Sequence, residues 1–330
     1  MAVGGDRGEL RTVSRGAELA ELLECARMAG RSVGLVPTMG ALHAGHRSLI
    51  ARAVAECDVV AVTVFVNPLQ FGDRSDIEHY PRDLAADLAL CAEVGADFVF
   101  APSVTEMYPG WPAPVATTVS VEGLSAAWEG ASRPGHFDGV TTVVAKLFSL
   151  AGRCRAYFGE KDFQQLAVVR QMVHDLSMPV AIVGCPTVRE SDGLALSSRN
   201  VRLTSAERRA ATVLSRALAA GRRAVAAGDT GVDDVMATMA EVVATAPTVD
   251  LDYAVVVDPN TLEVPAAIVP GVPWRLLIAA RVGPVRLIDN CEATLVTRGH
   301  GRRRPSVGAA SVGAASAGTR AVGTRAVGTR

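Results

Sequence analysis

VPTMGALHAGHRSLI, residues 36–50, is the stretch that decides the fold. It begins with apolar and β-branched residues, breaks at Gly40, and continues with the apolar spacing of a helix. We therefore predict a strand, a glycine turn and the start of a helix. His43 and His46 stand three residues apart in the first turn of that helix, so both imidazoles should lie on one face.

A helix start attracts anions, because it offers unpaired backbone N–H groups and the positive end of the helix dipole. Two imidazole N–H groups placed there suit a triphosphate better than a cation. Gly45 lies between the histidines, where it costs about 1 kcal/mol relative to Ala but leaves the backbone open to a ligand. A single histidine in a helix is usually a surface or core residue. Two of them around a glycine favour a phosphate site.

Composition places the chain among large globular proteins. It has 330 residues, of which 49% are hydrophobic, and this length suggests about two domains. Residues 1–10 lack the pattern of a secretory signal, and the best apolar run, residues 54–66, is short and contains Glu56 and Asp58. We expect a soluble cytoplasmic protein with no membrane partner.

Charge and cysteine usage narrow the function classes further. The net charge is −1, but residues 298–330 hold seven arginines and no acid, so residues 1–297 carry −8, which argues against a nucleic-acid partner. The cysteines have neither C-x-x-C nor metal-ligand spacing, so we expect buried free thiols rather than a protein metal site. They are Cys25, Cys57, Cys91, Cys154, Cys185 and Cys291.

Apolar, β-branched runs alternate with segments of helical length, which predicts an α/β fold with a Rossmann-like, doubly wound parallel sheet. The predicted strands cover residues 32–37, 59–66, 97–101, 156–158 and 180–183, and the intervening helices include residues 46–57 and 82–94.

In such sheets the ligand crevice lies beyond the carboxyl ends of the strands. Polar, specific segments follow four of the predicted strands and should converge there. They are TMGALHAGH, NPLQFG (67–72), GEKD (159–162) and ESDGLALSSRN (190–200).

Lysine occurs only at positions 146 and 161, although arginine is abundant. Lys161 and Gln165 should share a helix face, where a point charge and an amide can hold a phosphate and an oxygen-rich group. The alternative is an exposed lysine beside Asp162, which would complement the helix dipole.

Three other groups of residues are weaker candidates by themselves. Ser197, Ser198 and Arg199 can grip phosphate or cap a turn. Gln70 can bind a substrate hydroxyl or carboxylate, or serve as a turn amide. A Pro/Gly loop that can border the same site carries Arg133, His136 and Asp138, whereas His79 and His174 are expected to be surface residues.

No motif for a covalent nucleophile or a P-loop occurs in the chain. The remaining ways to accelerate a reaction are to position the substrates and to stabilise charge. Both suit nucleotidyl transfer at a phosphorus atom.

The second part of the chain predicts a smaller α+β domain that begins near Val188 and is a candidate lid. A capping box at residues 204–207 starts a helix that runs to Gly228, and residues 233–246 form another. A strand at 252–257 and a hairpin of 275–280 with 285–288 follow. We predict domains at 1–187 and 188–297, and a disordered tail at 298–330, which includes five glycine-containing pentads from residue 306 and to which we assign no function.

The chain contains, in this order, the motifs VPTMGALHAGH, FVNPLQFG, YFGEKDFQQLAVVRQMV and PTVRESDGLALSSRN. Together they resemble the pantothenate synthetase (pantoate:beta-alanine ligase) family over roughly residues 10–296. The resemblance implies that ATP activates pantoate as pantoyl adenylate, that beta-alanine then displaces AMP, that Mg²⁺ accompanies the ATP, and that the protein is a homodimer. The segment from His43 to His46 alone would indicate only the wider HIGH-motif nucleotidyltransferase superfamily.

The resemblance also assigns site residues. Gln70 would bind pantoate and beta-alanine, and Gln165 would bind pantoate. Leu196 replaces the family's usual methionine, a mild change between apolar side chains of similar volume. The catalytic residues would be His43, His46, Lys161, Ser197, Ser198 and Arg199. The ATP site would be Met39, Gly40, Ala41, Leu42, His43, Ala44, Gly45, His46, Gly159, Glu160, Lys161, Asp162, Val188, Leu196, Ser197, Ser198 and Arg199.

Two other functions remain open at this point. Another adenylyltransferase, acting on phosphopantetheine or nicotinamide nucleotide, would share the first motif but is not expected to carry the paired glutamines. A nucleotide-binding regulator that has lost catalysis would not be expected to keep His43, His46, Lys161 and Arg199.

Overall fold

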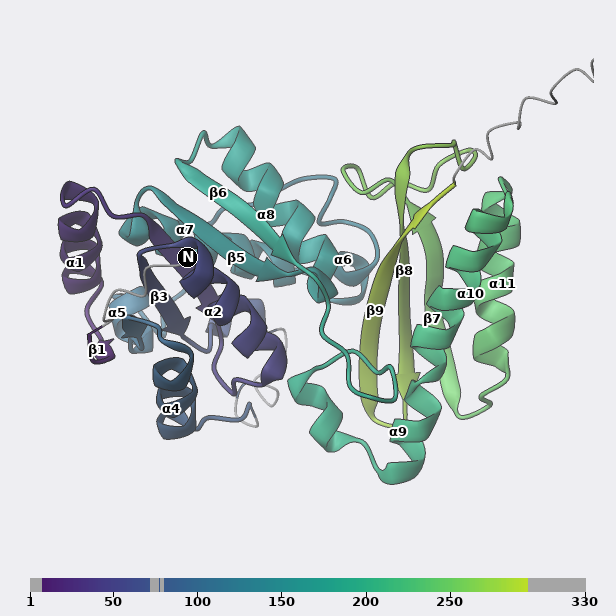
Figure 1. Cartoon of the computed structure of the whole chain (residues 1–330), viewed down its shortest axis with the longest axis horizontal. Helices are drawn as coiled ribbons and strands as arrows, with labels where there is room; N and C mark the ends of the chain where they lie inside the picture. The colour runs from purple at the N-terminus through teal and green to yellow at the C-terminus, as the bar shows by residue number, and fades with distance from the viewer. Residues whose placement is uncertain (1–7, 72–76, 78–79, 296–330) are drawn as a thin grey trace, which may run out of the picture. The chain divides into compact units, whose positions relative to one another are not determined.

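The computed structural model describes residues 8–71, 77 and 80–295. Its larger sheet has six strands in the order β1-β4-β3-β2-β5-β6, and every neighbouring pair is parallel. The predicted α/β class with a doubly wound sheet is therefore confirmed (Figure 1). The strands are β1 (Arg11–Val13), β2 (Val33–Thr38), β3 (Val59–Val64), β4 (Phe98–Phe100), β5 (Cys154–Gly159) and β6 (Val180–Cys185).

Helices lie between these strands, and apolar side chains are buried on both faces of the sheet. One core contains Leu19, Leu35 and Phe100, and the other contains Val36, Ile50 and Val62. Burial on both faces explains why the strands read as continuous apolar runs. The helices are α1 (Gly16–Met28), α2 (Ala44–Glu56), α4 (Leu84–Val94), α5 (Val104–Met107), α6 (Glu129–Ser132), α7 (His136–Ala151) and α8 (Phe163–Asp175), with short 3-10 turns η1 (Pro68–Gln70) and η2 (Glu160–Asp162).

The second sheet is an antiparallel meander of β7, β8 and β9. Figure 1 shows α10 and α11 against one face, and the other face packs on Phe163 and Ala167 at the start of α8. This second contact brings the meander next to the carboxyl end of β5. The elements are η3 (Ser198–Arg202), α9 (Ser205–Ala211), α10 (Val213–Ala227), α11 (Val232–Ala244), β7 (Val249–Val257), β8 (Pro273–Val282) and β9 (Val285–Thr294).

Several local predictions are confirmed and others need correction. The capping box of Thr204 with Glu207 and the helix end at Gly228 are present, but a break at Thr212 divides the predicted helix into α9 and α10. The hairpin strands are longer than predicted. Pairing runs from Pro273 and Thr294 at the open end to Val282 and Val285, next to the two-residue turn at Gly283 and Pro284. The predicted boundary near Val188 follows β6, and movement of the second part as a lid stays a prediction.

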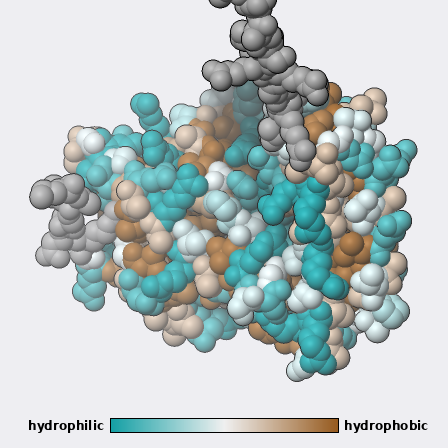
Figure 2. All heavy atoms as spheres, turned by 45° about the vertical axis from the view of Figure 1, so that its right-hand side comes forward, coloured by the Kyte–Doolittle hydropathy of each residue, from teal (hydrophilic) through white to brown (hydrophobic). Residues whose placement is uncertain are grey.

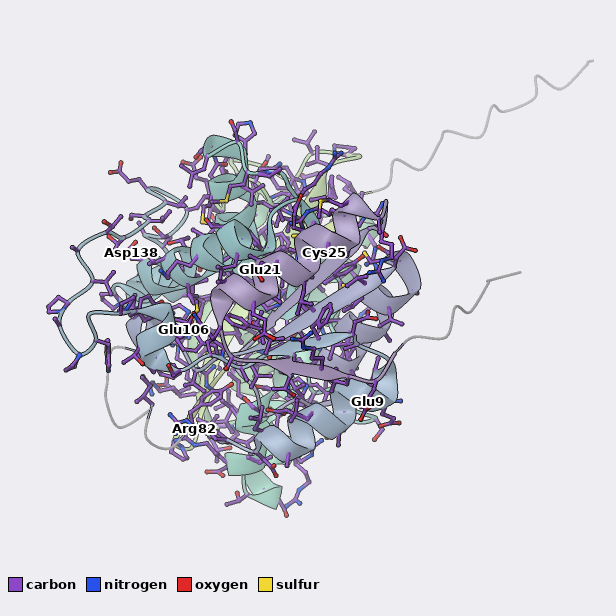
Figure 3. The ribbon with its side chains drawn as sticks, turned by 90° about the vertical axis from the view of Figure 1, so that its left-hand side faces the viewer. Glu9, Glu21, Cys25, Arg82, Glu106 and Asp138 are labelled. Atoms are coloured by element: carbon purple, nitrogen blue, oxygen red, sulfur yellow. The ribbon has the colours of Figure 1, made fainter. Side chains whose placement is uncertain are left out.

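The cysteines are free, as expected, but not all are buried. Cys25, labelled in Figure 3, is exposed on α1, and Cys291 is partly exposed on β9, where it packs against the core beneath α10. On the face seen in Figure 2, hydrophilic side chains are interspersed with smaller apolar areas. None of the helices in residues 8–71, 77 and 80–295 is long and apolar enough to cross a membrane. His79 and the pentad repeats lie outside these ranges.

Candidate active site

A cavity of about 770 Å³ opens beyond the carboxyl ends of β2, β5 and β6, within the size range of small-ligand sites. It brings together segments that are distant in the sequence, as the topology of a parallel sheet predicts. The predicted site residues along its wall are Met39, His43, Gly45, His46, Gln70, Gly159, Lys161, Asp162, Gln165, Val188, Leu196, Ser197, Ser198 and Arg199.

The other predicted ATP-site residues lie next to this wall rather than among the residues that line it. They are Gly40, Ala41, Leu42, Ala44 and Glu160. Arg133 and His136 line the cavity, whereas Asp138 accepts a hydrogen bond from the Ser120 hydroxyl at 2.7 Å and is labelled in Figure 3. His136 and Asp138 belong to the first turn of α7, not to a loop.

The two histidines form the N-terminal cap of α2. His43 is the N-cap residue, just outside the helix, and His46 is the third helical residue, so only one of them lies in the first turn. The Gly45 N–H donates to His43 Nδ1 at 3.1 Å, and the His43 N–H donates to His46 Nδ1 at 3.4 Å. Because a backbone N–H can only donate, each Nδ1 is unprotonated, and a neutral ring carries its proton on Nε2.

The close approach of the His43 ring explains the glycine between the histidines. The ring centroids lie 4.2 Å apart, and a Cβ added at Gly45 would approach His43 Nδ1 to 2.9 Å. A side chain at this position would push the His43 ring out of its capping bond. Gly45 therefore favours the cap itself, in addition to the access for a ligand that the sequence suggested.

Both histidines are held neutral by their surroundings. Burial, followed by the charge of Lys161, lowers the pKa of His43. The pKa of His46 falls to about 3, mainly through burial and also through its proximity to His43. At neutral pH both rings are therefore hydrogen-bond donors through Nε2 and carry no charge.

Asp87 of α4 anchors the loop before the histidines. Its carboxylate is 3% exposed and accepts the backbone N–H groups of Ala41 at 3.1 Å and Leu42 at 2.7 Å. Ala41 has φ 51°, a left-handed conformation that costs an L-residue roughly 1–2 kcal/mol. The two charge-assisted bonds offset this strain and fix the loop. In the sequence, Asp87 stands out only as an acidic residue within a mostly apolar helix, and this was the available signal for its role.

Gln70 lies in the 3-10 turn η1 and is 8% exposed. Its Nε2 lies 2.9 Å from Met39 Sδ, and its Oε1 accepts from Asn67 Nδ2 at 3.1 Å. Asn67 in turn donates to the Gly139 carbonyl oxygen at 2.9 Å and accepts from the Tyr108 hydroxyl at 2.8 Å. A buried polar network therefore fixes this glutamine, and sequence reasoning had no local signal for Tyr108.

The turn also depends on Gly139 of α7. A Cβ at this position would lie 2.3 Å from the Leu69 carbonyl oxygen and 2.6 Å from the Gln70 nitrogen, so only glycine permits the approach. His136 Nδ1 lies 2.9 Å from the Gln70 carbonyl oxygen, which can only accept, so the proton is on Nδ1. Burial, followed by the charge of Arg133, lowers the pKa of His136 to about 4.

Lys161 and Arg199 are among the cationic side chains that line the cavity. Lys161 is in η2 and not yet in α8, and its Nζ lies 3.6 Å from Asp162 Oδ1. Burial, the largest influence, raises the pKa of Asp162, but Lys161 and Arg199 outweigh it and the net shift is downward. Ser197 caps the η3 turn by accepting the Arg199 N–H at 3.2 Å. The charged side chains and the neutral donors thus line the same cavity.

Comparison with known proteins agrees with this geometry. The family model described as pantoate-beta-alanine ligase matches residues 11–292. The chain belongs to this family. It is 51% identical over 281 residues to pantothenate synthetase from Rhizobium meliloti, covering 85% of this chain and 95% of the relative, and 54% identical over 290 residues to the one from Nocardioides sp., covering 86% and 85%.

Solved structures of the family have the same fold. Pantothenate synthetase from Thermus thermophilus matches with a TM-score of 0.79 and 51% identity, over 86% of this chain and 99% of that chain. The ligase from Francisella tularensis, a complex with beta-gamma ATP and beta-alanine, matches with a TM-score of 0.69 and 32% identity, over 86% and 97%. The family resemblance of the four motifs is confirmed.

Proposed function

We propose that this ligase condenses pantoate with beta-alanine in two steps, with ATP as the activating substrate. The observation that carries this proposal is that one cavity holds the histidine cap, the cationic side chains of Lys161 and Arg199, and two glutamines. Histidines and cations suit a triphosphate, and glutamines suit a hydroxy acid. The combination favours adenylylation of a small carboxylate over adenylyl transfer to a larger nucleotide.

In the first step, ATP lies with its phosphates at the N-terminus of α2. His43 and His46 donate through Nε2, and the pentavalent phosphorus gains charge that Lys161 and Arg199 stabilise. Ser197 and Ser198 add hydroxyl donors on the same side. A carboxylate oxygen of pantoate attacks the α-phosphorus, and the bond to pyrophosphate breaks.

In the second step, the amine of beta-alanine attacks the acyl carbon of the adenylate, and AMP leaves. Gln70 and Gln165 hold the pantoyl group through their amides, and Gln70 also borders beta-alanine. Positioning of this kind supplies much of the rate in reactions without a covalent enzyme intermediate.

Magnesium enters this scheme as part of the substrate. In the part of the chain that the structure describes, no three His, Cys, Asp or Glu residues are grouped to hold a metal ion. Mg²⁺ prefers few protein ligands and several phosphate or water oxygens, so MgATP is the substrate that we propose. We further propose that the protein is cytoplasmic and that it is a homodimer. Analytical ultracentrifugation of the full chain would test the dimer.

One assay tests the function. The protein is incubated with ATP, Mg²⁺, pantoate and beta-alanine, and AMP and pyrophosphate are measured with each substrate omitted in turn. Pyrophosphate should require pantoate, and AMP should require both organic substrates. AMP that forms without them, or no AMP at all, would refute the proposal. Pyrophosphate that forms with phosphopantetheine or nicotinamide mononucleotide would favour the alternative adenylyltransferases.

A further inference from the structure

Two adjacent polar residues of β9, Asp289 and Asn290, are almost fully buried, at 4% and 3% exposure. Neither belongs to the four motifs, and both lie in the second sheet rather than in the nucleotide-binding one. Buried polar groups need partners, so their hydrogen bonds show what they hold in place.

The Asn290 side chain holds the backbone of the lysine turn. Its Nδ2 donates to the carbonyl oxygens of Glu160 at 2.9 Å and Lys161 at 2.8 Å. Its Oδ1 accepts from Arg275 Nε at 2.8 Å. The carbonyls can only accept and the guanidinium can only donate, so the amide has one possible orientation.

Arg275 holds the side chains of the same turn. It is 7% exposed, and its Nη2 lies 3.1 Å from Glu160 Oε2. Its guanidinium carbon lies 4.1 Å from the centroid of the Phe163 ring, a cation–π contact. Asn290 and Arg275 therefore fix Glu160, Lys161 and the first residue of α8 from both backbone and side chain.

Asp289 holds the segment that leads to the second cation. Its carboxylate forms a two-pronged ion pair with Arg189, at 2.5 and 2.9 Å. Arg189 also donates to the Gly193 carbonyl oxygen at 3.1 Å and pairs in an isolated bridge with Ala195. These contacts of Arg189 close the base of the loop of residues 190–194. The segment from Leu196 to Arg199 follows directly after it.

We propose that Asp289 and Asn290 are positioning residues for the adenylylation step, which rests on the proposed function. Asn290 sets the place of Lys161, and Asp289 sets that of the loop carrying Arg199. One dipeptide of the second sheet thereby fixes two cationic segments that line the same cavity as the histidine cap. Neither residue has to touch substrate to affect the rate.

The test compares Asn290→Asp with a matched control. Aspartate has nearly the same size and keeps an acceptor for Arg275, but it cannot donate to the two carbonyl oxygens. Leu287→Ala removes a buried side chain from the same strand, within the core under α10 and α11, and so lowers stability away from the turn. Thermal midpoints of both variants are measured. Asn290→Ser, which keeps one donor, replaces Asn290→Asp if the latter does not fold.

The readout is single-turnover release of pyrophosphate from ATP and pantoate. Asn290→Asp should slow this step by about 10- to 100-fold, because displacement of a catalytic group by about 1 Å has effects of this size. Leu287→Ala should stay within about threefold of the unsubstituted enzyme. The KM of beta-alanine should be unchanged in both variants.

Double variants separate positioning from general stability. In a Lys161→Ala background, Asn290→Asp should change the rate by less than about threefold, and Asp289→Asn should likewise lose its effect in an Arg199→Ala background. Independent, multiplying effects in an active enzyme, or a loss equal to that of Leu287→Ala, would overturn the positioning role. An unsubstituted protein that releases no pyrophosphate would instead refute the proposed function.

Discussion

The neutral state of His46 makes a prediction about stability. In the unfolded chain a histidine has a pKa of about 6.5, whereas the folded protein lowers that of His46 to about 3, first through burial and then through His43. Between these values the unfolded chain binds a proton that the folded protein does not bind. The free energy of unfolding should therefore fall as the pH falls below about 6.5.

The size of the effect follows from the two pKa values. Full differential protonation changes the free energy of unfolding by about 1.4 kcal/mol per pH unit. Between pH 8 and pH 5, His46 should cost the folded state about 2 kcal/mol. The ring is partly exposed at the cavity wall, and water there screens its surroundings, so this figure is an upper value.

His46→Asn isolates this contribution. Asparagine keeps a side-chain acceptor at the third helical position but does not titrate. Urea unfolding of both proteins at pH 8, 7, 6 and 5 should show the unsubstituted protein losing up to about 2 kcal/mol more than the variant. His136, whose pKa is about 4, is present in both proteins and cancels. A difference in unfolding free energy that stays constant from pH 8 to pH 5 would refute the reasoning.

Four further substitutions test the site. Asp87→Ala leaves two backbone donors of the loop unsatisfied and should lower stability by about 1–3 kcal/mol and raise the KM of ATP; Asp83→Ala, which removes only the cap of α4, should leave that KM unchanged. Gly139→Ala should raise the KM of pantoate several-fold by displacing the Gln70 turn, and an unchanged KM would contradict that role. Lys161→Arg should slow pyrophosphate release on the order of 10-fold, because a guanidinium is not a compact point charge; unaltered kinetics would mean that the lysine is retained by chance. His46→Ala should slow the same step about 10²-fold, as expected for loss of one preorganised donor, and near-normal turnover would exclude it.

The sequence was sufficient to predict the central strands and the convergence of the polar segments on one cavity. β2 and β3 are buried on both faces and appear as continuous apolar runs, and parallel pairing brings their carboxyl ends to one edge. β1 was missed because three residues with one buried side chain carry no periodicity, and this strand pairs only with β4. Its formation depends on a partner almost ninety residues away.

The supporting contacts of the site could not be predicted for the same reason. Asp87 bonds a loop 45 residues earlier in the chain, and Asn290 bonds a turn 129 residues earlier. Such partners depend on tertiary packing, which propensity and local spacing do not encode. The His43 cap is more local, but histidine is not a usual capping residue, so the pattern predicted both rings within the first helical turn rather than one at the N-cap.

Because of the capping bonds, the neutral histidines of the cavity can act as directional hydrogen-bond donors, whereas the positive charge is supplied by other residues. Lys161 and Arg199 supply positive charge to the cavity, and the charge of Lys161 itself contributes to the low pKa of both histidines. A charged imidazole beside these cations would add repulsion and, with a proton on Nδ1, would lose its capping bond. The neutral ring instead keeps Nδ1 on the backbone and aims Nε2–H away from it. The directional donors at the helix start and the charge of Lys161 are thus coupled, and Asp289 and Asn290 would set the places of the two segments that carry Lys161 and Arg199.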